Sequence, residues 1–568
     1  MDIRRTLLWV IFSFSLLLLW NNWQVYNGRE PLFGAAPQSQ TATPEQAATD
    51  EVAEVADTAI PTATAPERPA DEDTSTEVTT APEPQAQDVS SELTTIDTPL
   101  LKLTFDTLGA QLVRAELHEY TAPNDPDHPM VLFDHTDNYT YLAQSGVVGA
   151  PAGQQYPTHQ TPFELVSTDG AAGSGPAEVV FKATDGDIEV TKTFRIEPDS
   201  YAIHVTHELT NHGDSAVQPA VYHQLVRDDS DPQETSTFYR TFTGPALYSE
   251  DEKFQKVSFS DIDKGKAKYI ASADNGWIGM VQHYFASAWV PAQGTARTNE
   301  VLNLRDNLYA IRTIESAGSI QPGDTGQVNA DLWVGPQDQK AMSELAPGLE
   351  LVVDYGWLTI LSKPLFKLMT GIHALLGNWG WTIIVLTLLI KAVFYPLSAA
   401  SYRSMAKMKN VAPRMKALKE KFGDDKAKMN AAMMEMYRTE KINPLGGCLP
   451  MLVQIPVFIA LYWVLLGSVE MRGAPWVLWI QDLSVRDPWF ILPAFMMATM
   501  FLQIKLNPTP PDPMQARIMM IMPLVFGGMM FFFPAGLVLY WCMNNAVSII
   551  QQRYIMHRID KEAAAAAR

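Results

Sequence analysis

Cysteine is almost absent from this chain, which removes one common way of stabilising a fold. Only Cys448 and Cys542 occur in the 568 residues, and both lie in apolar segments. Residues 6–355 contain none, so a disulfide framework is excluded there. A region of roughly 250 residues buries enough apolar surface to fold without disulfides. We therefore expect the polar part of the chain to be held together by its core alone.

Basic residues are scarce over the same stretch. Residues 6–355 hold 51 acidic and 18 basic side chains, whereas residues 356–568 hold 11 acidic and 22 basic ones. The net charge of −21 therefore averages two regions of opposite sign. A nucleic-acid-binding surface needs clustered cations, so we expect no nucleic-acid partner for the acidic region. Its charge predicts a solvated acidic surface.

Motifs for catalysis and cofactor binding are also missing. No glycine-rich phosphate loop precedes a predicted helix. His204 and His207 lie an odd number of positions apart in a predicted strand, so they would point to opposite faces and share no metal. We expect no catalytic residue, no metal and no cofactor, and thus a protein that is not an enzyme.

The first long apolar run begins after the basic start MDIRR and extends from Thr6 to Trp20. A cleaved signal peptide has a similar pattern. No small-x-small cleavage site follows the run, however, and the nearby Trp23 and Tyr26 are typical of a membrane interface. Residues 1–26 are therefore predicted to form an uncleaved transmembrane anchor with its N-terminus in the cytoplasm.

Two segments of different texture follow the anchor. Residues 27–98 are rich in Ala, Thr, Pro and acidic residues, cannot bury enough surface to offset chain entropy, and are predicted to be a disordered periplasmic linker. Residues 99–355 contain short alternating runs separated by turn residues, such as the Asp185-Gly186 pair. This pattern predicts a large antiparallel β-sandwich, which the preceding anchor places in the periplasm.

From residue 356 the apolar period changes to that of a helix. Residues 356–376 carry an apolar stripe with Lys363 and Lys367 opposite it, which predicts an amphipathic helix in the membrane surface. A helix facing a soluble core is the alternative. The stripe consists of Leu358, Leu361, Leu365, Leu368, Ile372 and Leu375.

Five further apolar spans are predicted within residues 377–552. Several are shorter than the roughly 20 residues that a bilayer core requires. With the anchor they give a multi-pass α-helical membrane protein with six transmembrane helices and a large periplasmic all-β sandwich domain. The spans are Trp379–Tyr395, Cys448–Gly467, Trp489–Ile504, Ile518–Phe533 and Leu537–Ile550.

Loop charges predict the orientation of these spans. Residues 396–447 hold 11 basic and 5 acidic side chains, and the tail at residues 553–568 is also basic. The positive-inside rule places both on the cytoplasmic side of the membrane. Six spans beginning in the cytoplasm also return the C-terminus there, so span parity and loop charge agree.

Residues 397–446 are predicted to form a helical hairpin of two helices, 399–422 and 426–442, joined by Gly423, Asp424 and Asp425. Most of its apolar residues are methionines. They either pack the two helices together along a seam or offer an adaptable surface to varied apolar partners. The methionines are Met405, Met408, Met415, Met429, Met433, Met434 and Met436.

Lys391 is the one formally charged residue inside the five C-terminal spans. A lysine at mid-bilayer costs on the order of 3 kcal/mol, so an intramembrane charge is a candidate functional site. The alternative is that Lys391, roughly 6 Å of helix before Tyr395, extends to the headgroups. Polar residues of neighbouring spans favour a shared hydrated concavity, namely Thr387, Gln454, Tyr540, Asn544, Asn545 and Ser548.

Four runs in the C-terminal third carry a family resemblance: FYPLSAASYRSMAKMK after Lys391, NPLGGCLPMLVQIPVFIALYWVL, DPMQARIMMIMP and FPAGLVLYW. Two more, GWIGMVQHYFASAWVP and VDYGWLTILSKPLFKL, lie upstream. Together these runs resemble the YidC insertases and their organellar relatives. The resemblance implies a membrane protein insertase and chaperone that inserts and helps fold inner-membrane proteins, alone or with the Sec translocon.

The resemblance also implies a site. In the family the five core spans form a hydrophilic groove, open to cytoplasm and lipid, that holds an arginine attracting acidic residues of the substrate. Lys391 occupies this position, which keeps the positive charge but not the guanidinium fork. Thr387, Tyr540 and Trp541 match groove residues that contact substrate in the family. A substrate-facing helix is matched by the run that includes Cys448, Pro450 and Ile455.

The resemblance further implies that the cytoplasmic hairpin, with Met405, Met408, Asp424, Asp425 and Met433, receives the nascent chain. The partners implied are nascent membrane proteins, the Sec translocon, a transiently bound ribosome and membrane lipids. The β-domain is expected to be a sugar-mutarotase-like supersandwich without a catalytic role.

Two other functions remain as alternatives. A secondary transporter or channel would use Lys391 to bind a solute or proton, and it would be favoured by a second buried charge or an inverted repeat, neither of which the sequence shows. A membrane-tethered carbohydrate enzyme would need paired acid and base groups in a cleft of the β-domain.

Overall fold

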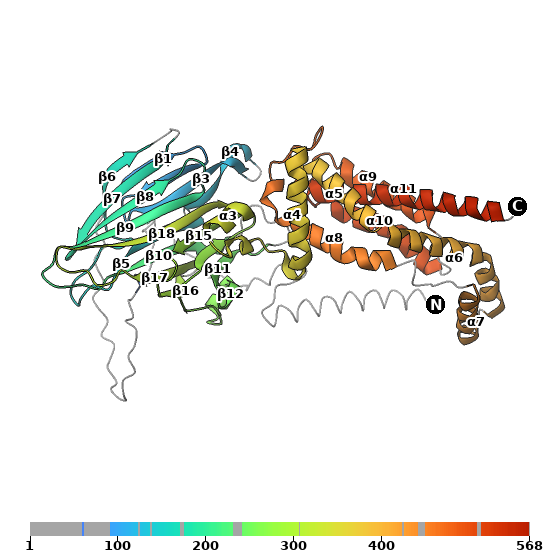
Figure 1. Ribbon diagram of the computed structural model, residues 1–568, viewed down its shortest axis with the longest axis horizontal. Coiled ribbons are helices and arrows are strands. Elements are labelled where there is room, and N and C mark those ends of the chain that lie inside the picture. Colours follow the sequence, from blue (N-terminus) through green and yellow to red (C-terminus); the bar gives the residue numbers. More distant parts are fainter. Residues whose placement is uncertain are drawn as a thin grey trace, which may run out of the picture. The chain divides into compact units, whose positions relative to one another are not determined.

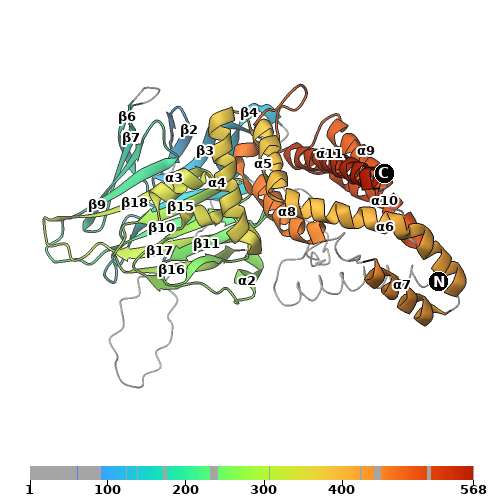
Figure 2. The same ribbon diagram turned by 45° about the vertical axis from the view of Figure 1, so that its right-hand side comes forward.

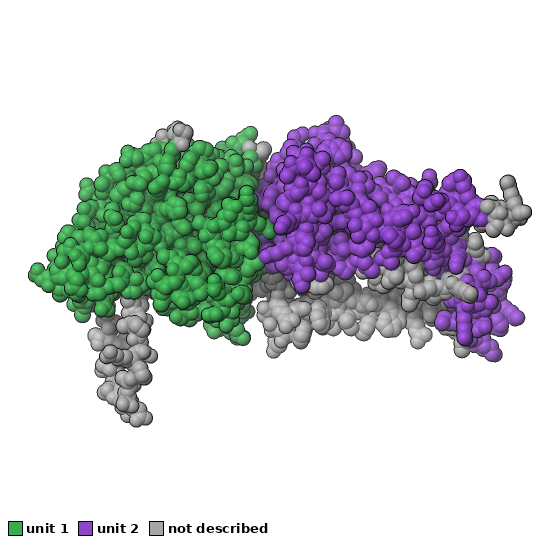
Figure 3. Space-filling model, viewed as in Figure 1, with its two compact units in different colours: residues 1–352 green, residues 353–568 purple. Residues whose placement is uncertain are grey.

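The computed structural model describes residues 60–61, 91–122, 125–136, 139–170, 175–230, 241–305, 307–422, 425–440, 449–507 and 513–566. The chain divides into two compact units, residues 1–352 and 353–568 (Figure 3). The predicted anchor 1–26, most of the predicted linker, Cys448 and Asp424 lie outside the described residues, as does the side chain of Pro450.

The first unit contains two nine-stranded antiparallel sheets (Figure 1). The first sheet has the order β1-β2-β3-β4-β5-β10-β17-β16-β13. Its strands are β1 (Leu93–Asp97), β2 (Leu101–Asp106), β3 (Gln111–Ala122), β4 (Asp125–Thr136), β5 (Tyr139–Val148), β10 (Ala220–Asp228), β13 (Ser272–Ala273), β16 (Arg297–Arg305) and β17 (Leu308–Ser316).

The second sheet has the order β12-β11-β14-β15-β18-β9-β8-β7-β6. Short helices α2 (Phe259–Asp263) and α3 (Gln339–Leu345) and the 3-10 turn η1 (Leu349–Val352) complete the unit. The strands are β6 (Glu164–Asp169), β7 (Ala177–Asp185), β8 (Ile188–Ile196), β9 (Ala202–Asn211), β11 (Gly244–Ser249), β12 (Lys253–Lys256), β14 (Trp277–Val281), β15 (Phe285–Pro291) and β18 (Thr325–Pro336).

The core lies between the two sheets, which confirms the predicted large all-β sandwich. Trp289 of the second sheet donates from its indole nitrogen to the Gln224 carbonyl of the first, at 3.1 Å. Tyr141 of the first sheet bonds Ser287 of the second through their hydroxyls. Side chains of this size bury enough apolar area to stabilise the unit without disulfides.

Strand alternation places the two histidines of β9 as predicted. His207 is fully buried and bonds the Ser145 hydroxyl at 2.8 Å, whereas His204 is exposed and bonds Asp331 of β18. They lie on opposite faces of the sheet because successive strand residues alternate. Within the described residues, no group of three or more His, Cys, Asp or Glu side chains is placed to hold a metal ion.

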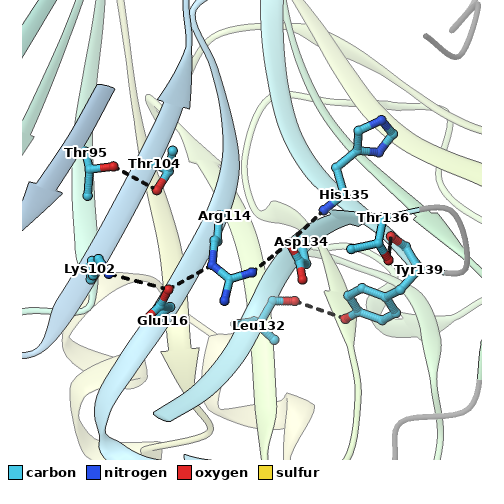
Figure 4. Close-up of polar contacts among 10 residues, drawn as sticks. All are labelled: Thr95, Lys102, Thr104, Arg114, Glu116, Leu132, Asp134, His135, Thr136 and Tyr139. Atoms are coloured by element: carbon cyan, nitrogen blue, oxygen red, sulfur yellow. Dashed lines mark hydrogen bonds and ion pairs between the residues drawn. The ribbon is translucent and has the colours of Figure 1, made fainter. Parts of the chain in front are cut away.

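Ion pairs and hydroxyl contacts connect the first strands of the first sheet (Figure 4). Arg114 of β3 lies 2.8 Å from Glu116 on its own strand and 2.9 Å from Asp134 of β4. Thr95 of β1 bonds Thr104 of β2 at 3.2 Å. The Arg114–Asp134 and Thr95–Thr104 contacts cross from strand to strand and therefore support the register on this face.

The predicted linker was too long at its C-terminal end. It extended to residue 98, but residues 93–97 form β1 and pair with β2, with Ile96 fully buried opposite Leu103. The segment LTTID contains only two large apolar residues, so composition alone assigned it to the linker. Threonine is nevertheless favourable in strands, and an edge strand needs to bury one face only.

The second unit is helical (Figures 1 and 2). A 3-10 turn, η2 (Gly356–Leu358), precedes its first helix, and another, η3 (Val469–Met471), follows α8. The helices are α4 (Thr359–Leu376), α5 (Trp379–Val393), α6 (Tyr395–Phe422), α7 (Lys426–Thr439), α8 (Leu449–Gly467), α9 (Ile491–Leu506), α10 (Pro513–Met530) and α11 (Ala535–Ala566).

By length and apolar composition, no single helix in the described part of the chain meets the requirement for a membrane span. One bent pair meets it jointly, α5 with the first part of α6, across a bend of 64°. Shorter apolar helices lie at Val453–Gly467, Ile491–Leu506 and Ala516–Met530. The predicted count of six transmembrane helices is therefore not confirmed, although helices occupy each of the five C-terminal spans.

Only part of the leucine stripe predicted for residues 356–376 is buried by the protein. Ser362, Met369 and Ile372 are buried, whereas Leu368 and Leu375 are exposed. The helix packs against α5 and α8 through a face rotated from the stripe. A helix at a membrane surface has two apolar surroundings, protein and lipid, so an apolar period does not identify which residues face the protein.

Candidate functional site

Helix α5 positions Lys391 in its last turn. The helix begins at a capped end, where the side chain of Asn378 accepts a hydrogen bond from the backbone of Trp381 at 3.1 Å. Lys391 follows three turns later and is only 6% exposed. A charged side chain this deeply buried needs polar partners, because desolvation of an ammonium is costly.

Two neutral residues from two other helices supply those partners, and a third residue joins the two. The Lys391 ammonium donates to the Ser548 hydroxyl at 2.7 Å and to the Gln454 amide oxygen at 3.4 Å. Gln454 in turn donates to the Asn544 amide oxygen at 2.5 Å, and the Ser548 hydroxyl donates to the Asn544 carbonyl at 2.7 Å. Lys391, Gln454, Asn544 and Ser548 are called the Lys391 cluster below.

No carboxylate of the described residues neutralises this cation. Among the ion pairs formed by the described residues, none includes Lys391. Its neutral oxygen partners satisfy hydrogen-bonding capacity but leave the positive charge uncompensated. The cluster can therefore attract an anionic group that approaches it.

Two members of the site's surroundings were not predicted from the sequence. The Tyr402 hydroxyl of α6 donates to the Ser548 carbonyl at 3.4 Å, and the Gln551 amide of α11 donates to the Lys391 carbonyl at 3.4 Å. The spacing of 544, 548 and 551 on one helix face was a usable signal for Gln551. No comparable signal existed for Tyr402, because its approach depends on the bend between α5 and α6.

Only some of the predicted polar companions gather around Lys391. Gln454, Asn544 and Ser548 do, whereas the Asn545 amide donates to the Thr499 hydroxyl of α9 at 3.4 Å. Thr387 is buried one turn from Lys391, and its hydroxyl donates to the Ile383 carbonyl of its own helix at 2.7 Å.

The aromatic residues assigned to the groove gather around Phe458 of α8, and the Tyr540 hydroxyl also interacts with Gln454 of the Lys391 cluster. The Phe458 ring lies 6.0 Å from the Tyr540 ring and 4.5 Å from the Trp541 ring, between centroids. Trp541 also meets Phe526 of α10 at 4.9 Å. Ile455, on α8 beside Gln454, is 44% exposed. These side chains link α8, α10 and α11 without a hydrogen bond to Lys391.

The methionine-rich hairpin is packed along one seam. Val411 and Met415 of α6 are buried, and Met408, Met436 and Tyr437 pack against them. Met405 and Met433 are half-buried, and Met434 is exposed. Asp425 caps α7 by accepting from the Lys428 backbone at 3.1 Å. Packing thus accounts for part of the methionine set, and Met434 remains available at the surface.

Known protein families and curated relatives match both the β unit and the helical unit of this chain. Residues 93–368 match the family described as YidC periplasmic domain, and residues 371–562 match the 60Kd inner membrane protein family. The chain is 63% identical over 570 residues to the membrane protein insertase YidC of Bordetella petrii and 49% identical over 577 residues to that of Paraburkholderia phymatum. Both alignments cover 100% of each chain.

A solved structure described as an active YidC insertase with its first transmembrane domain resolved is also similar, at 18% identity and a TM-score of 0.38. The alignment covers 82% of this chain and 93% of that one. The sequence relatives match the whole chain, including both its β-sandwich and its helical unit. The chain therefore belongs to the YidC family of membrane protein insertases, which reside in the inner membrane and carry a periplasmic domain.

Proposed function

We propose that the insertase uses the Lys391 cluster as a transient counter-ion for acidic residues of an incoming polypeptide. The observation that carries this proposal is a buried ammonium whose hydrogen-bond partners, Gln454 and Ser548, are both neutral. An acidic side chain that meets this ammonium gains a charge-assisted hydrogen bond at a depth where water is scarce.

The energetics require no nucleotide and no catalytic group. Burial of apolar area in lipid yields about 25 cal/mol per Å², which for a segment of roughly 20 residues far exceeds the other terms. An acidic residue at mid-membrane opposes insertion by on the order of 3 kcal/mol. The cation therefore needs to offset only a few kcal/mol during passage, while lipid burial drives insertion.

The short helices support a short path across the membrane. Helix α5 has 15 residues and α9 has 16. At 1.5 Å per residue they span about 22–24 Å, less than the roughly 30 Å of a hydrocarbon core. A bilayer that thins beside these helices would shorten the distance over which a polar tail must move.

The proposed topology has six spans, formed by residues 1–26 and the five apolar spans within residues 377–552. Both termini and the hairpin at residues 397–446 would lie in the cytoplasm, with the β unit in the periplasm. This arrangement agrees with the positive-inside rule, since the hairpin and tail are basic. The amphipathic helix at residues 356–376 would lie along the periplasmic membrane surface.

The proposed substrate path includes more than the Lys391 cluster. Thr387, Ile455, Tyr540 and Trp541 would line a groove together with residues 448–450. The hairpin, including Met405, Met408, Met433 and the 424–425 turn, would receive the nascent chain from a transiently bound ribosome. The Sec translocon and membrane lipids are the remaining proposed partners. The exposed Met434 supports a surface for apolar segments, because methionine adapts to varied partners.

Insertion into proteoliposomes tests this function. Purified wild-type, Lys391→Arg and Lys391→Ala proteins would be reconstituted, and a single-span substrate with an acidic N-terminal tail would be scored by protease protection of the tail. We expect wild type and the arginine variant to protect the tail and the alanine variant to lose most of this protection. A substrate with a neutral tail serves as the control and should be protected by all three.

Equal protection of the acidic tail by all three proteins would mean that Lys391 is an anchor extending to the headgroups. Protection no greater than in empty liposomes, for either tail, would contradict insertase activity of the purified chain and favour the transporter alternative.

A further inference from the structure

Lys391 is covered in this structure. The side chain is 6% exposed, and its ammonium points toward Ser548 and Gln454. If Lys391 meets acidic side chains of substrates, as the proposed function requires, a residue that covers it must move aside, because the side chain is buried even though the ammonium has a third donor. The hydrogen-bond geometry identifies which of the two partners is easier to displace.

The two bonds are unequal. Ser548 accepts from the ammonium at 2.7 Å, within the usual range for a strong hydrogen bond, and its own proton is used on the Asn544 carbonyl. Gln454 accepts at 3.4 Å, near the outer limit. Because hydrogen bonds weaken with distance, loss of the Gln454 contact costs the ammonium less. A carboxylate oxygen in its place would form the stronger, charge-assisted bond.

Gln454 also joins three helices. It lies on α8, accepts from Lys391 of α5 and donates to Asn544 of α11 at 2.5 Å. Its departure would therefore open the ammonium and loosen the contact between α8 and α11 at this level. Gln454 thus covers the Lys391 ammonium and, through its bond to Asn544, also holds α8 against α11.

The backbone around Gln454 is weakened at one point. Pro456 lies inside α8, two residues beyond Gln454. A proline has no N–H, so the carbonyl of Leu452, four residues before it, lacks its usual helical hydrogen bond. The first turns of α8, which carry Gln454, are therefore easier to displace than an uninterrupted helix would be.

From these contacts we infer that Gln454 is a placeholder for the substrate carboxylate. Its amide oxygen occupies the position that an acidic side chain of the incoming segment takes, and it leaves with the first turns of α8 when that side chain arrives. Ser548 and Asn544 stay and hold the ammonium in position. Gln454 is thus a positioning residue that selects for acidic segments, since a neutral segment gains less by displacing it.

The rate at which an amine reagent modifies Lys391 measures directly how well its side chain is covered. Full-length wild-type, Gln454→Leu and Gln552→Leu proteins in detergent would be treated with an amine-acetylating reagent, and modification of Lys391 would be followed by peptide mass spectrometry. Gln552 is the matched control, because its amide joins α11 to Asn507 at 3.0 Å without touching Lys391. The exposed Lys340 of the β unit is the internal reference.

We expect Gln454→Leu to raise the Lys391 rate, relative to Lys340, by roughly two- to tenfold, the range for one hydrogen bond of ordinary strength, because this charged bond is weakened by its length of 3.4 Å. Gln552→Leu should leave the rate unchanged. Measurements at two pH values distinguish altered exposure from altered protonation. An unchanged rate in Gln454→Leu, or an equal rise in both variants, would overturn the inference.

The preference for acidic over neutral tails supplies a second readout, because this preference would not change if Gln454 only stabilised the fold. Gln454→Glu places a permanent carboxylate beside Lys391, so it should reduce insertion of the acidic-tail substrate severalfold while leaving the neutral-tail substrate near wild type. Gln454→Asn, which keeps the amide on a shorter side chain, should retain the preference for acidic tails. Equal losses on both substrates in Gln454→Glu would contradict the placeholder role.

The labelling experiment requires no insertion, so it remains informative if the proposed function fails. Faster labelling of Gln454→Leu, with no effect of Lys391→Ala on insertion, would show that Gln454 covers Lys391 but that Lys391 does not act on the substrate. If insertion by the wild type is lost in Lys391→Ala but the Lys391 labelling rate is unchanged in Gln454→Leu, the proposed function is supported and the placeholder role of Gln454 is rejected.

Discussion

Single buried polar residues hold parts of both units, and Asp487 is the clearest case in the helical one. Its carboxylate accepts from the Leu492 backbone at 2.7 Å, the Trp489 backbone at 3.0 Å and the Trp479 indole at 2.9 Å. It thereby caps α9, whose own N-cap position, Phe490, has a left-handed backbone and no side-chain cap. One carboxylate therefore fixes both the loop and the start of the helix.

Replacement of Asp487 by alanine should destabilise the helical unit by about 2–3 kcal/mol, because three donors lose a charged acceptor at once. Thermal unfolding of the full chain in detergent, followed by tryptophan fluorescence, measures this change. Asp482→Ala is the matched control, since that carboxylate serves only Ser484, at 2.7 Å from its backbone nitrogen. A comparable loss in both variants would argue against a special role for Asp487.

In the β unit, buried His223 is the corresponding residue. Both of its ring nitrogens lack a hydrogen-bond partner within the described residues. It faces His207 of β9, Trp289 of β15, Lys192 of β8 and Glu315 of β17. Burial, together with the nearby charges of Lys192 and Arg297, lowers the pKa of His223 to about 3. Burial conversely raises the pKa of Glu315 to about 7.

Since the pKa of His223 is lower in the folded than in the unfolded chain, the unfolded state takes up the extra proton. His223 thus stabilises the fold fully above pH 6.5, and this contribution is lost progressively as the pH falls toward 3. Glu315 acts in the opposite sense, because its raised pKa favours the folded state at low pH.

In His223→Gln, the stability lost on acidification from neutral pH to about pH 5 should be smaller by about 2 kcal/mol. Chemical denaturation of the full chain at several pH values tests this change. The identical pH dependence in wild type and variant would show that His223 does not titrate on unfolding.

At the scale of elements, the β7–β8 hairpin shows what a two-residue turn requires. Asp185 pairs with Ile188, leaving Gly186 and Asp187 as the turn, with Gly186 at φ +59°. A side chain at Gly186 would suffer from this left-handed backbone, and its Cβ would lie 2.8 Å from the Gln155 carbonyl oxygen. Both the left-handed backbone and the close contact oppose substitution. Glycines that have only one of these features, or neither, distinguish their contributions.

Gly186→Ala should cost about 2 kcal/mol or more, since left-handed strain of about 1–2 kcal/mol adds to the close contact. Gly153→Ala should cost about 1 kcal/mol, because it has positive φ but open space around its Cβ. Gly175→Ala, with neither feature, should be nearly neutral. Denaturation midpoints of the three variants would contradict this account if they did not follow that order.

Local periodicity predicted elements better than it predicted their surroundings. The strand alternation and the odd spacing of His204 and His207 depend on backbone geometry alone, so the sequence was sufficient for both. The two-residue turn is Gly186-Asp187, one position beyond the predicted Asp185-Gly186 pair. The leucine stripe of α4 predicted an apolar helix but not which of its residues the protein covers: Ile372 is buried, whereas Leu368 is exposed. Ile96 of β1 was assigned to the linker, because its partner Leu103 is visible only after the sheet forms.

The same distinction applies to the Lys391 cluster. Gln454, Asn544 and Ser548 were predicted to gather near the lysine because polar residues in apolar spans avoid lipid. Thr387 was included by the same rule, yet its hydroxyl is satisfied within its own helix. Pairwise distances that rank Ser548 above Gln454 depend on how α5, α8 and α11 pack, which residue type and spacing do not specify.

For the whole molecule, the opposite charges of residues 6–355 and 356–568 reflect different surroundings. Most described residues of the acidic part form the β-sandwich, whereas the basic excess of the second part is concentrated in residues 396–447. The basic hairpin and the short apolar helices each limit how the protein fits a bilayer. The charges favour one orientation, and the helix lengths favour one thickness.

Bilayer thickness should therefore control the insertion rate. Helix α5, with 15 residues, is about 8 Å shorter than a typical hydrocarbon core, and mismatch costs a fraction of a kcal/mol per Å. The protein must thin a thick bilayer further, so the acidic-tail substrate should insert severalfold faster in vesicles of short-chain than of long-chain phosphatidylcholine. Lys391→Ala should be slower in every lipid yet keep the same dependence on thickness, because it removes the charge and not the thinning. A rate independent of chain length would show that the short helices leave the bilayer unthinned, and the cation would then have to act across its full depth.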